Sequence, residues 1–333
     1  MRSLIRSLGS FLRRYGAPLW LVIILTLAIV FGLRQRQELG HIVATLRGAD
    51  PYWLASIVVL EGGILALIAV TYQALLSRLG HAVRFHSLVG VHLHRIVVGT
   101  VTPVGGPSSM LVFVHKLRQR GVRPADALLA VSIKSVIGNA AFLMLLLPVL
   151  LVQEPSLLLI GSTFGLVALV AVMAAILVLV LRQRKPPRWL VRRLPRRSLR
   201  FVVQIRQHEI APHGLIAPFT YLLTTKIAGV GMLFLALRAV GHHSDIQVPL
   251  IAYVVGMVFL LVAPVFQGIG FVEVSIAVAL QRLGVPPAAA IGATLLCRVG
   301  ELWLPLAAGI ALQLSETARR GHRHIAVPAG TGD

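Results

Sequence analysis

The chain has 333 residues, of which 57% are hydrophobic and only 13% are charged, and this excludes a water-soluble globular protein. The composition indicates an integral membrane protein. Its 32 basic and 11 acidic residues give a formal net charge of +21, but the basic residues lie in loops between hydrophobic segments, which favours membrane topology and anionic lipid over nucleic acid as the explanation.

Six segments are expected to cross the membrane, because each holds close to the ~20 mostly apolar residues that one crossing requires. They cover residues 17–33, 52–77, 127–152, 157–181, 215–237 and 288–314. The first is followed by Arg34, Gln35 and Arg36 without a small-residue cleavage site, so we expect an uncleaved signal anchor.

Two further apolar stretches are interrupted by glycine and proline. Residues 88–114 contain Gly105 and Gly106, and residues 248–280 contain Gly268 and Gly270. The first stretch is too short for two crossings, which take roughly 40 residues. Each stretch is therefore expected to form a broken hairpin that re-enters the membrane and returns to its starting side.

The distribution of basic residues predicts the orientation, because lysine and arginine accumulate on the cytoplasmic side of short loops. With the N-terminus inside, the basic loops on either side of the first hairpin, the linker at residues 182–213 and the C-terminal tail all fall on the cytoplasmic side. We therefore expect a multi-pass protein of the cell (inner) membrane with both termini in the cytoplasm.

An internal repeat is also expected. The stretch Gly121-Val122-Arg123-Pro124-Ala125-Asp126-Ala127 matches Gly284-Val285-Pro286-Pro287-Ala288-Ala289-Ala290 at five of seven positions, and both copies follow a broken hairpin. The repeats would cover residues 17–152 and 157–314, with the second inverted because each half has an odd number of crossings. The alternative is that both copies are a common helix start with proline in the first turn. The predicted fold class is an all-α, polytopic membrane helical bundle of six full spans and two re-entrant hairpins, in a single transmembrane domain.

Few ionisable residues fall inside the apolar segments, where a charge costs about 2.5–3.5 kcal/mol near the membrane centre. The basic ones are Lys134, Lys226 and Arg298, and the acidic ones are Glu61, Glu273 and Glu301. In one interpretation they only neutralise each other. Arg298 and Glu301 would share a helix face, Glu273 would either cap a half-helix or pair with Arg298, and Glu61 would pair with Lys226.

The functional interpretation is that the two hairpins meet near the middle of the membrane and bind an anionic lipid phosphate. Exposed half-helix amides at Gly105, Gly106, Gly268 and Gly270 would favour the anion, and Lys134, Lys226 and Arg298 would supply positive charge. The glycines could instead serve close helix packing. Proton coupling through Glu61 and Glu273 is a further alternative.

The histidines do not form a metal-binding pattern. His92 and His94 would lie on different faces of a helix, and no carboxylate or cysteine completes a ligand set; the only cysteine is Cys297. We expect these histidines to lie in a solvated loop at the inner membrane surface, together with His81 and His86. No metal or cofactor is expected.

These residues and motifs resemble the transmembrane region of the lysylphosphatidylglycerol synthase/flippase family over nearly the whole chain. The most specific stretches are Pro264-Val265-Phe266-Gln267-Gly268-Ile269-Gly270-Phe271-Val272-Glu273, Gly284-Val285-Pro286, Arg298 with Trp303-Leu304-Pro305, and Thr102-Pro103-Val104-Gly105-Gly106. Where the family pattern often continues into an acidic residue, this chain has Pro107-Ser108-Ser109. The soluble aminoacyl-transferring domain of the full-length synthases is not found.

The resemblance implies lipid translocation and argues against lipid lysinylation by this chain. The leading hypothesis is a transporter, not an enzyme, that moves a phospholipid or related anionic lipid between leaflets. The alternative is a non-transporting membrane partner that anchors or regulates a lipid-modifying or glycosyl-transferring enzyme. An intramembrane enzyme has less support, because no adequate set of acid, base and metal-binding residues is evident.

Overall fold

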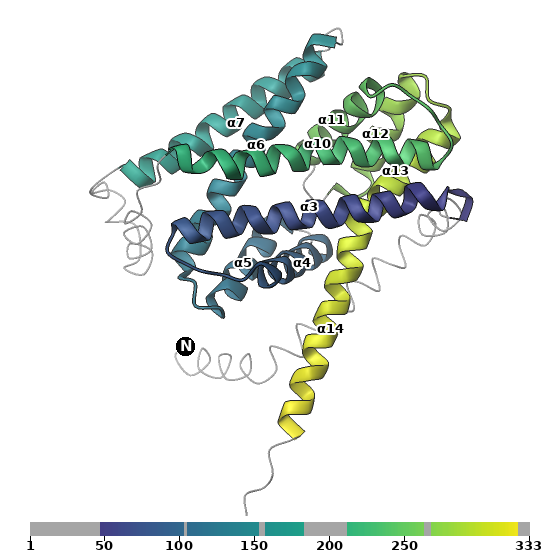
Figure 1. Cartoon of the computed structure of the whole chain (residues 1–333). Coiled ribbons are helices and arrows are strands. Elements are labelled where there is room, and N and C mark those ends of the chain that lie inside the picture. Colours follow the sequence, from purple (N-terminus) through teal and green to yellow (C-terminus); the bar gives the residue numbers. More distant parts are fainter. Residues whose placement is uncertain (1–46, 103–104, 153–156, 183–211, 263–267, 326–333) are drawn as a thin grey trace, which may run out of the picture.

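The structure is a computed structural model that describes residues 47–102, 105–152, 157–182, 212–262 and 268–325. Within these ranges every regular element is a helix, as predicted (Figure 1). The predicted first span, residues 183–211 of the basic linker and residues 263–267 of the second hairpin lie outside the described residues.

Four of the predicted spans are confirmed as helical stretches that are long and apolar enough to cross a membrane. They are Pro51–Arg78, Pro124–Leu150, His213–Ala239 and Pro287–Thr317. The first three correspond to α3 (Pro51–Arg78), α6 (Pro124–Val152), and the short 3-10 turn η1 (Pro212–Leu215) with α10 (Ile216–Ala239). The helix α7 (Leu157–Arg182) occupies the predicted span at residues 157–181, and its described apolar stretch is Thr163–Ala175.

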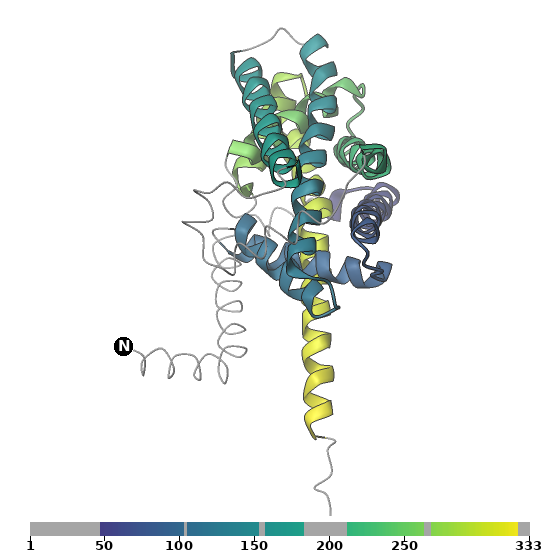
Figure 2. The ribbon, with the colours of Figure 1, turned by 90° about the vertical axis from the view of Figure 1, so that its left-hand side faces the viewer.

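The helices α3 and α10 lie side by side and run in opposite directions (Figures 1 and 2). At one end the Asp50 N–H, just before α3, donates to the carbonyl of Ala239 at the end of α10, at 3.1 Å. At the other end the guanidinium of Arg78, the last residue of α3, lies against Gly214 just before α10. This antiparallel pair lies along one side of the bundle, and α6 packs against both of its helices (Figure 2).

Both predicted hairpins are pairs of packed helices. The first consists of α4 (Phe85–Val101) and α5 (Gly105–Arg118), and the second of α11 (Gln247–Val262) and α12 (Phe271–Arg282). Each hairpin packs on a spanning helix from the other half of the chain, because α11 contacts α6 and α4 contacts α14 (Leu304–Ile325).

The two copies of the repeated motif fold in the same way. Gly121 follows α5 with φ 83°, and Gly284 follows α12 with φ 88°, a backbone conformation that favours glycine. The next residue then closes the turn: Val122 N–H donates to the Leu117 carbonyl at 3.1 Å, and Val285 N–H donates to the Leu280 carbonyl at 3.0 Å. Each copy therefore ends one helix and starts the next.

The last predicted span is not one continuous α-helix. It consists of α13 (Pro287–Arg298), the π-helical turn η3 (Val299–Trp303) and α14. The Leu304 N–H donates to the Val299 carbonyl five residues earlier, and the next residue, Pro305, has no N–H to donate. Glu301 thus lies within a π turn, a distortion that often occurs at functional sites.

The apolar interior consists of two clusters of buried side chains. One contains Met232, Leu233 and Leu237 of α10 with residues of α6 and α11 to α13. The other contains Tyr72 and Leu76 of α3 with residues of α4, α5 and the first half of α6. The predicted ionisable residues lie along these two clusters.

Candidate functional site

Glu273 and Arg298 form a buried ion pair at the start of α12. Arg298 Nε donates to Glu273 Oε1 at 2.6 Å, and the two side chains are only 5% and 12% exposed, respectively. The Gly270 N–H donates to the second carboxylate oxygen, Glu273 Oε2, at 2.7 Å. Glu273 therefore caps α12 and pairs with Arg298 at once, so the two roles predicted as alternatives occur together.

Glu301 is the centre of a wider set of charges. It interacts electrostatically with Arg298 and Lys226, and its carboxylate accepts a hydrogen bond from the Tyr253 hydroxyl. Glu61 of α3, which is 6% exposed, also faces the charge of Glu301. We call Glu61, Lys226, Glu273, Arg298 and Glu301 the central charge cluster.

Tyr253 reaches Glu301 because a glycine of the neighbouring helix leaves room for its ring. The Tyr253 hydroxyl lies where a Cβ would stand at Gly229 of α10, and the Tyr253 side chain is buried. A buried phenol normally finds a hydrogen-bond partner, and here the partner is a carboxylate. The prediction that Lys226 would pair with Glu61 is replaced by an arrangement in which both face Glu301.

A second polar group surrounds Tyr72 of α3. Arg95 Nη1 donates to the Tyr72 hydroxyl at 2.7 Å, and the Lys134 ammonium lies 5.8 Å from the centre of the Tyr72 ring. The ring of His92 packs beside that of Tyr72, and its Nδ1 atom is buried without a hydrogen-bond partner in the described part of the chain. We call Tyr72, His92, Arg95 and Lys134 the tyrosine cluster.

The two clusters lie close to each other. Lys134 of α6, in the tyrosine cluster, and Lys226 of α10, in the central charge cluster, are near enough for their positive charges to repel. Among the described residues no carboxylate forms an ion pair with Lys134. A row of polar groups, some buried and some half-buried, therefore extends from α4, through α3, α6 and α10, to α11, α12, α13 and η3. We call it the polar row. In this row Lys226 faces the carboxylate of Glu301, whereas Lys134 lies nearest to the Tyr72 ring and to Lys226.

The four predicted glycines lie at the start of the second helix of each hairpin. Gly105 and Gly106 begin α5, and the Gly106 carbonyl accepts a hydrogen bond from Ser109. Gly268 and Gly270 precede α12 with φ 71° and 85°. The Gly270 N–H that was expected to face an anion donates to Glu273.

The prediction that the histidines lie in a solvated loop is wrong for two of them. His92 and His94 belong to α4 and are buried, because this helix begins at Phe85 and packs on α3, α5 and α14. His81 is hydrogen-bonded to the fully buried Asp126, whereas His86 is exposed. Within the described ranges no group of three histidine, cysteine or acidic side chains is arranged to hold a metal ion.

Sequence reasoning missed Tyr72, Arg95 and Tyr253 as members of the polar row. The available signal was the phenol hydroxyl inside an apolar helix, which requires a partner once water is excluded. Tyr72 stands in α3 and Tyr253 in α11, each amid apolar residues.

The comparison with known families decides the relationship of the chain. Residues 19–309 match the family described as the lysylphosphatidylglycerol synthase TM region. The chain belongs to this family. Among curated proteins no relative matches the chain.

Membership in the lysylphosphatidylglycerol synthase TM region family agrees with the apolar helices of the bundle. The chain is a multi-pass membrane protein of a lipid-related, flippase-like family. The match includes both hairpins, the central charge cluster and the tyrosine cluster.

Proposed function

We propose that this protein moves an anionic phospholipid between the leaflets of the membrane and does not catalyse a reaction on it. The observation that carries the proposal is the polar row, to which seven helices and the π turn contribute. Maintaining this many ionisable groups among apolar helices is costly, and such groups commonly mark substrate paths in membrane proteins.

The charges of the row suit an anionic headgroup. Lys134 and Lys226 place two amines that can carry positive charge in the interior, and Lys134 forms no ion pair with a carboxylate among the described residues. A lipid phosphate passing between them would neutralise that charge while its acyl chains remain in the bilayer. The pair of Glu273 and Arg298 holds the second hairpin at the row.

We propose further that the chain consists of two inverted halves, which would rearrange around the hairpins during transport. Three features support this: α3 and α10 are antiparallel, each hairpin packs on a span of the other half, and the two repeated motifs make the same turn. Repeats related in this way are common in transporters, with the substrate site at their interface.

In this proposal the C-terminal ends of α3 and α10 face opposite sides of the inner membrane: that of α3 faces the cytoplasm and that of α10 faces the outside. Both termini of the chain lie in the cytoplasm. The buried Cys297 would first be changed to serine, since it is the only cysteine in the sequence. New cysteines at the exposed Gln119 and His243 then report the two sides. A membrane-impermeant maleimide added to intact cells should label His243→Cys, and should label Gln119→Cys only after the membrane is opened; labelling of both from one side rules out the inverted arrangement.

Reconstitution into liposomes tests the transport itself. Purified protein is expected to bring headgroup-labelled phosphatidylglycerol from the inner leaflet to an impermeant quencher outside faster than protein-free liposomes do. Arg298→Gln should slow this movement, whereas Arg282→Gln, an exposed cation at the end of α12, should not. A parent protein without any effect on lipid movement, combined with stable co-purification of a lipid-modifying enzyme, favours the anchoring role over transport.

A further inference from the structure

A surface pocket of about 450 Å³ lies outside the polar row, between the start of α4, the turn after α5 and the middle of α14. Its polar lining includes Arg84, His86, Ser87, Arg120 and Glu316. The apolar side chains of Ala82, Val83 and Leu312 complete the walls. The pocket thus combines polar and apolar groups, as a site for both the headgroup and the first part of the acyl chains of a lipid would require.

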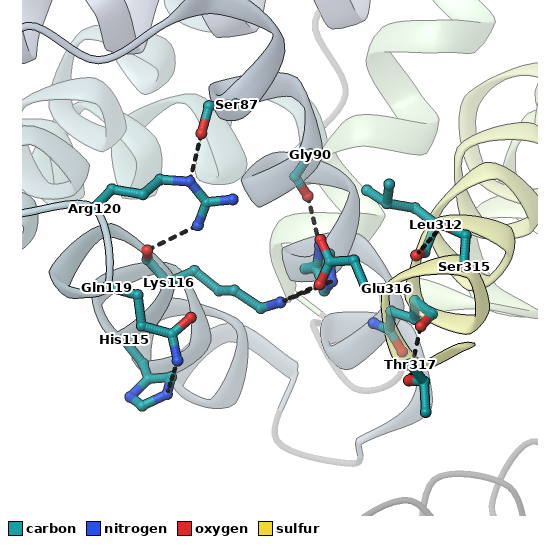
Figure 3. Close-up of polar contacts among 12 residues, drawn as sticks. Ser87, Gly90, His115, Lys116, Gln119, Arg120, Leu312, Ser315, Glu316 and Thr317 are labelled. Atoms are coloured by element: carbon teal, nitrogen blue, oxygen red, sulfur yellow. Dashed lines mark hydrogen bonds and ion pairs between the residues drawn. The ribbon is translucent and has the colours of Figure 1, made fainter. Parts of the chain in front are cut away.

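The side chain of Arg120 in this pocket is held in place by hydrogen bonds (Figure 3). Arg120 Nε donates to the Ser87 hydroxyl, and its Nη1 donates to the Lys116 carbonyl at 2.9 Å. This connects the end of α5 to the first turn of α4. Arg84, the residue before α4, has no side-chain hydrogen bond that caps the helix. The pocket is lined by residues of the first turn of α4, where the helix dipole is positive.

Glu316 occupies the anionic position of this region. The Lys116 ammonium donates to Glu316 Oε2 at 3.0 Å and lies 2.9 Å from His94 Nε2 (Figure 3). The His94 Nδ1 atom is 2.7 Å from the Gly90 carbonyl, which orients the ring. Among the described residues, Arg84 and Arg120 line the pocket together with Glu316, which pairs with Lys116 and also faces the charge of Arg120.

The position of Glu316 is fixed by close packing of its helix. A Cβ at Gly309 of α14 would stand 2.9 Å from the Leu93 carbonyl of α4, so the two helix backbones approach closely there. Glu316 lies two turns further along α14. On the same part of α14, Ile310 and Leu314 are exposed apolar side chains, available to acyl chains.

We propose that this pocket binds the phosphate group of an anionic glycerophospholipid through Arg84 and Arg120, with Glu316 as a negative charge in the same pocket that opposes the phosphate. This proposal rests on the proposed function: the pocket would bind the headgroup on the cytoplasmic side before the headgroup enters the polar row. Phosphate matches the arginine fork and the helix N-terminus, whereas a zwitterionic headgroup adds a positive charge that this region disfavours.

The test is equilibrium binding of dihexanoylphosphatidylglycerol to the full-length protein in phosphocholine nanodiscs. The double variant Arg84→Gln with Arg120→Gln is expected to lower the affinity at least about tenfold. Glu316→Gln is expected to raise the affinity several-fold, because it removes the competing charge. Arg118→Gln, an exposed arginine of α5 outside the pocket lining, is the matched control and should leave the affinity unchanged.

The opposite signs separate this proposal from a loss of folding, and thermal unfolding of each variant checks that the fold is retained. Unchanged affinity in the double arginine variant overturns the proposal, as does weaker binding in Glu316→Gln. Inorganic phosphate provides the second arm. If phosphate alone binds at the same residues, the site recognises a free anion. If the short-chain lipid binds and phosphate does not displace it, the site recognises the lipid headgroup. Because binding is measured without transport, a protein that binds the lipid here but does not translocate it contradicts only the proposed function.

Discussion

The carboxylate of Glu273 links the guanidinium of Arg298 to the start of another helix. One oxygen accepts from Arg298 Nε at 2.6 Å and the other accepts from the Gly270 N–H at 2.7 Å. The broken second hairpin is thereby fastened to the last span at the point where α13 passes into the π turn.

This arrangement predicts strong coupling between the two residues. Arg298→Ala or Glu273→Ala alone removes one partner of this ion pair and is expected to lower the free energy of unfolding by roughly 3–5 kcal/mol. The combined change to Arg298→Met and Glu273→Leu should cost less than either single alanine variant. Denaturant unfolding in detergent micelles measures all three, and a double variant that costs more than either single variant would show that the pair is not coupled.

The close approach of Tyr253 to α10 predicts a specific effect of one added methyl group. Gly229→Ala places a Cβ on the Tyr253 hydroxyl, so the ring must leave Glu301. We expect a loss of roughly 1–3 kcal/mol, the range for overpacking in a filled interior. Gly231→Ala in the same helix is the matched control, because its Cβ would meet only Leu60 at 3.6 Å; equal melting temperatures for the two variants contradict the packing described.

Asp126 predicts a variant that changes stability but not transport. Its carboxylate is fully buried and accepts from Arg123 Nε at 2.7 Å, with His81 Nε2 also at 2.7 Å, where α6 begins. Asp126→Ala removes the acceptor for both groups and is expected to cost roughly 1–3 kcal/mol. The translocation rate per folded molecule should stay at the parent value, and a lower rate at full folding would assign Asp126 a role in transport.

Much of the fold follows from the sequence, because bilayer thickness sets the length of an apolar helix. The spans at α3, α6 and α10, and the breaks in both hairpins, were predictable from runs of apolar residues and from glycine and proline. The π turn was not predicted, since the hydropathy of a span does not register a shifted hydrogen bond. Its cause, Pro305 without an N–H, is nevertheless visible in the sequence.

The candidate site was only partly predictable, because its contacts join residues far apart in the chain. Burial of Glu273, Arg298 and Lys134 among apolar residues indicated that each needs surrounding polar groups. The partners of Lys134 and Glu301 turned out to include Tyr72 and Tyr253, which depend on how α3 and α11 are rotated. Sequence periodicity also gave no indication that His94 would face Lys116 and Glu316.

Lys134 provides the most direct test of the proposed path, since it is a half-buried cation that lies over the Tyr72 ring. Lys134→Met replaces it with an apolar side chain of similar length, so the melting temperature should rise while the path loses positive charge. Asp126→Ala serves as the comparison, because it should lower stability and leave transport intact. The deciding measurement is the rate of phosphatidylglycerol movement in liposomes: we predict a rate at least about tenfold below the parent for a fully folded Lys134→Met protein, and a parent-like rate would contradict the account.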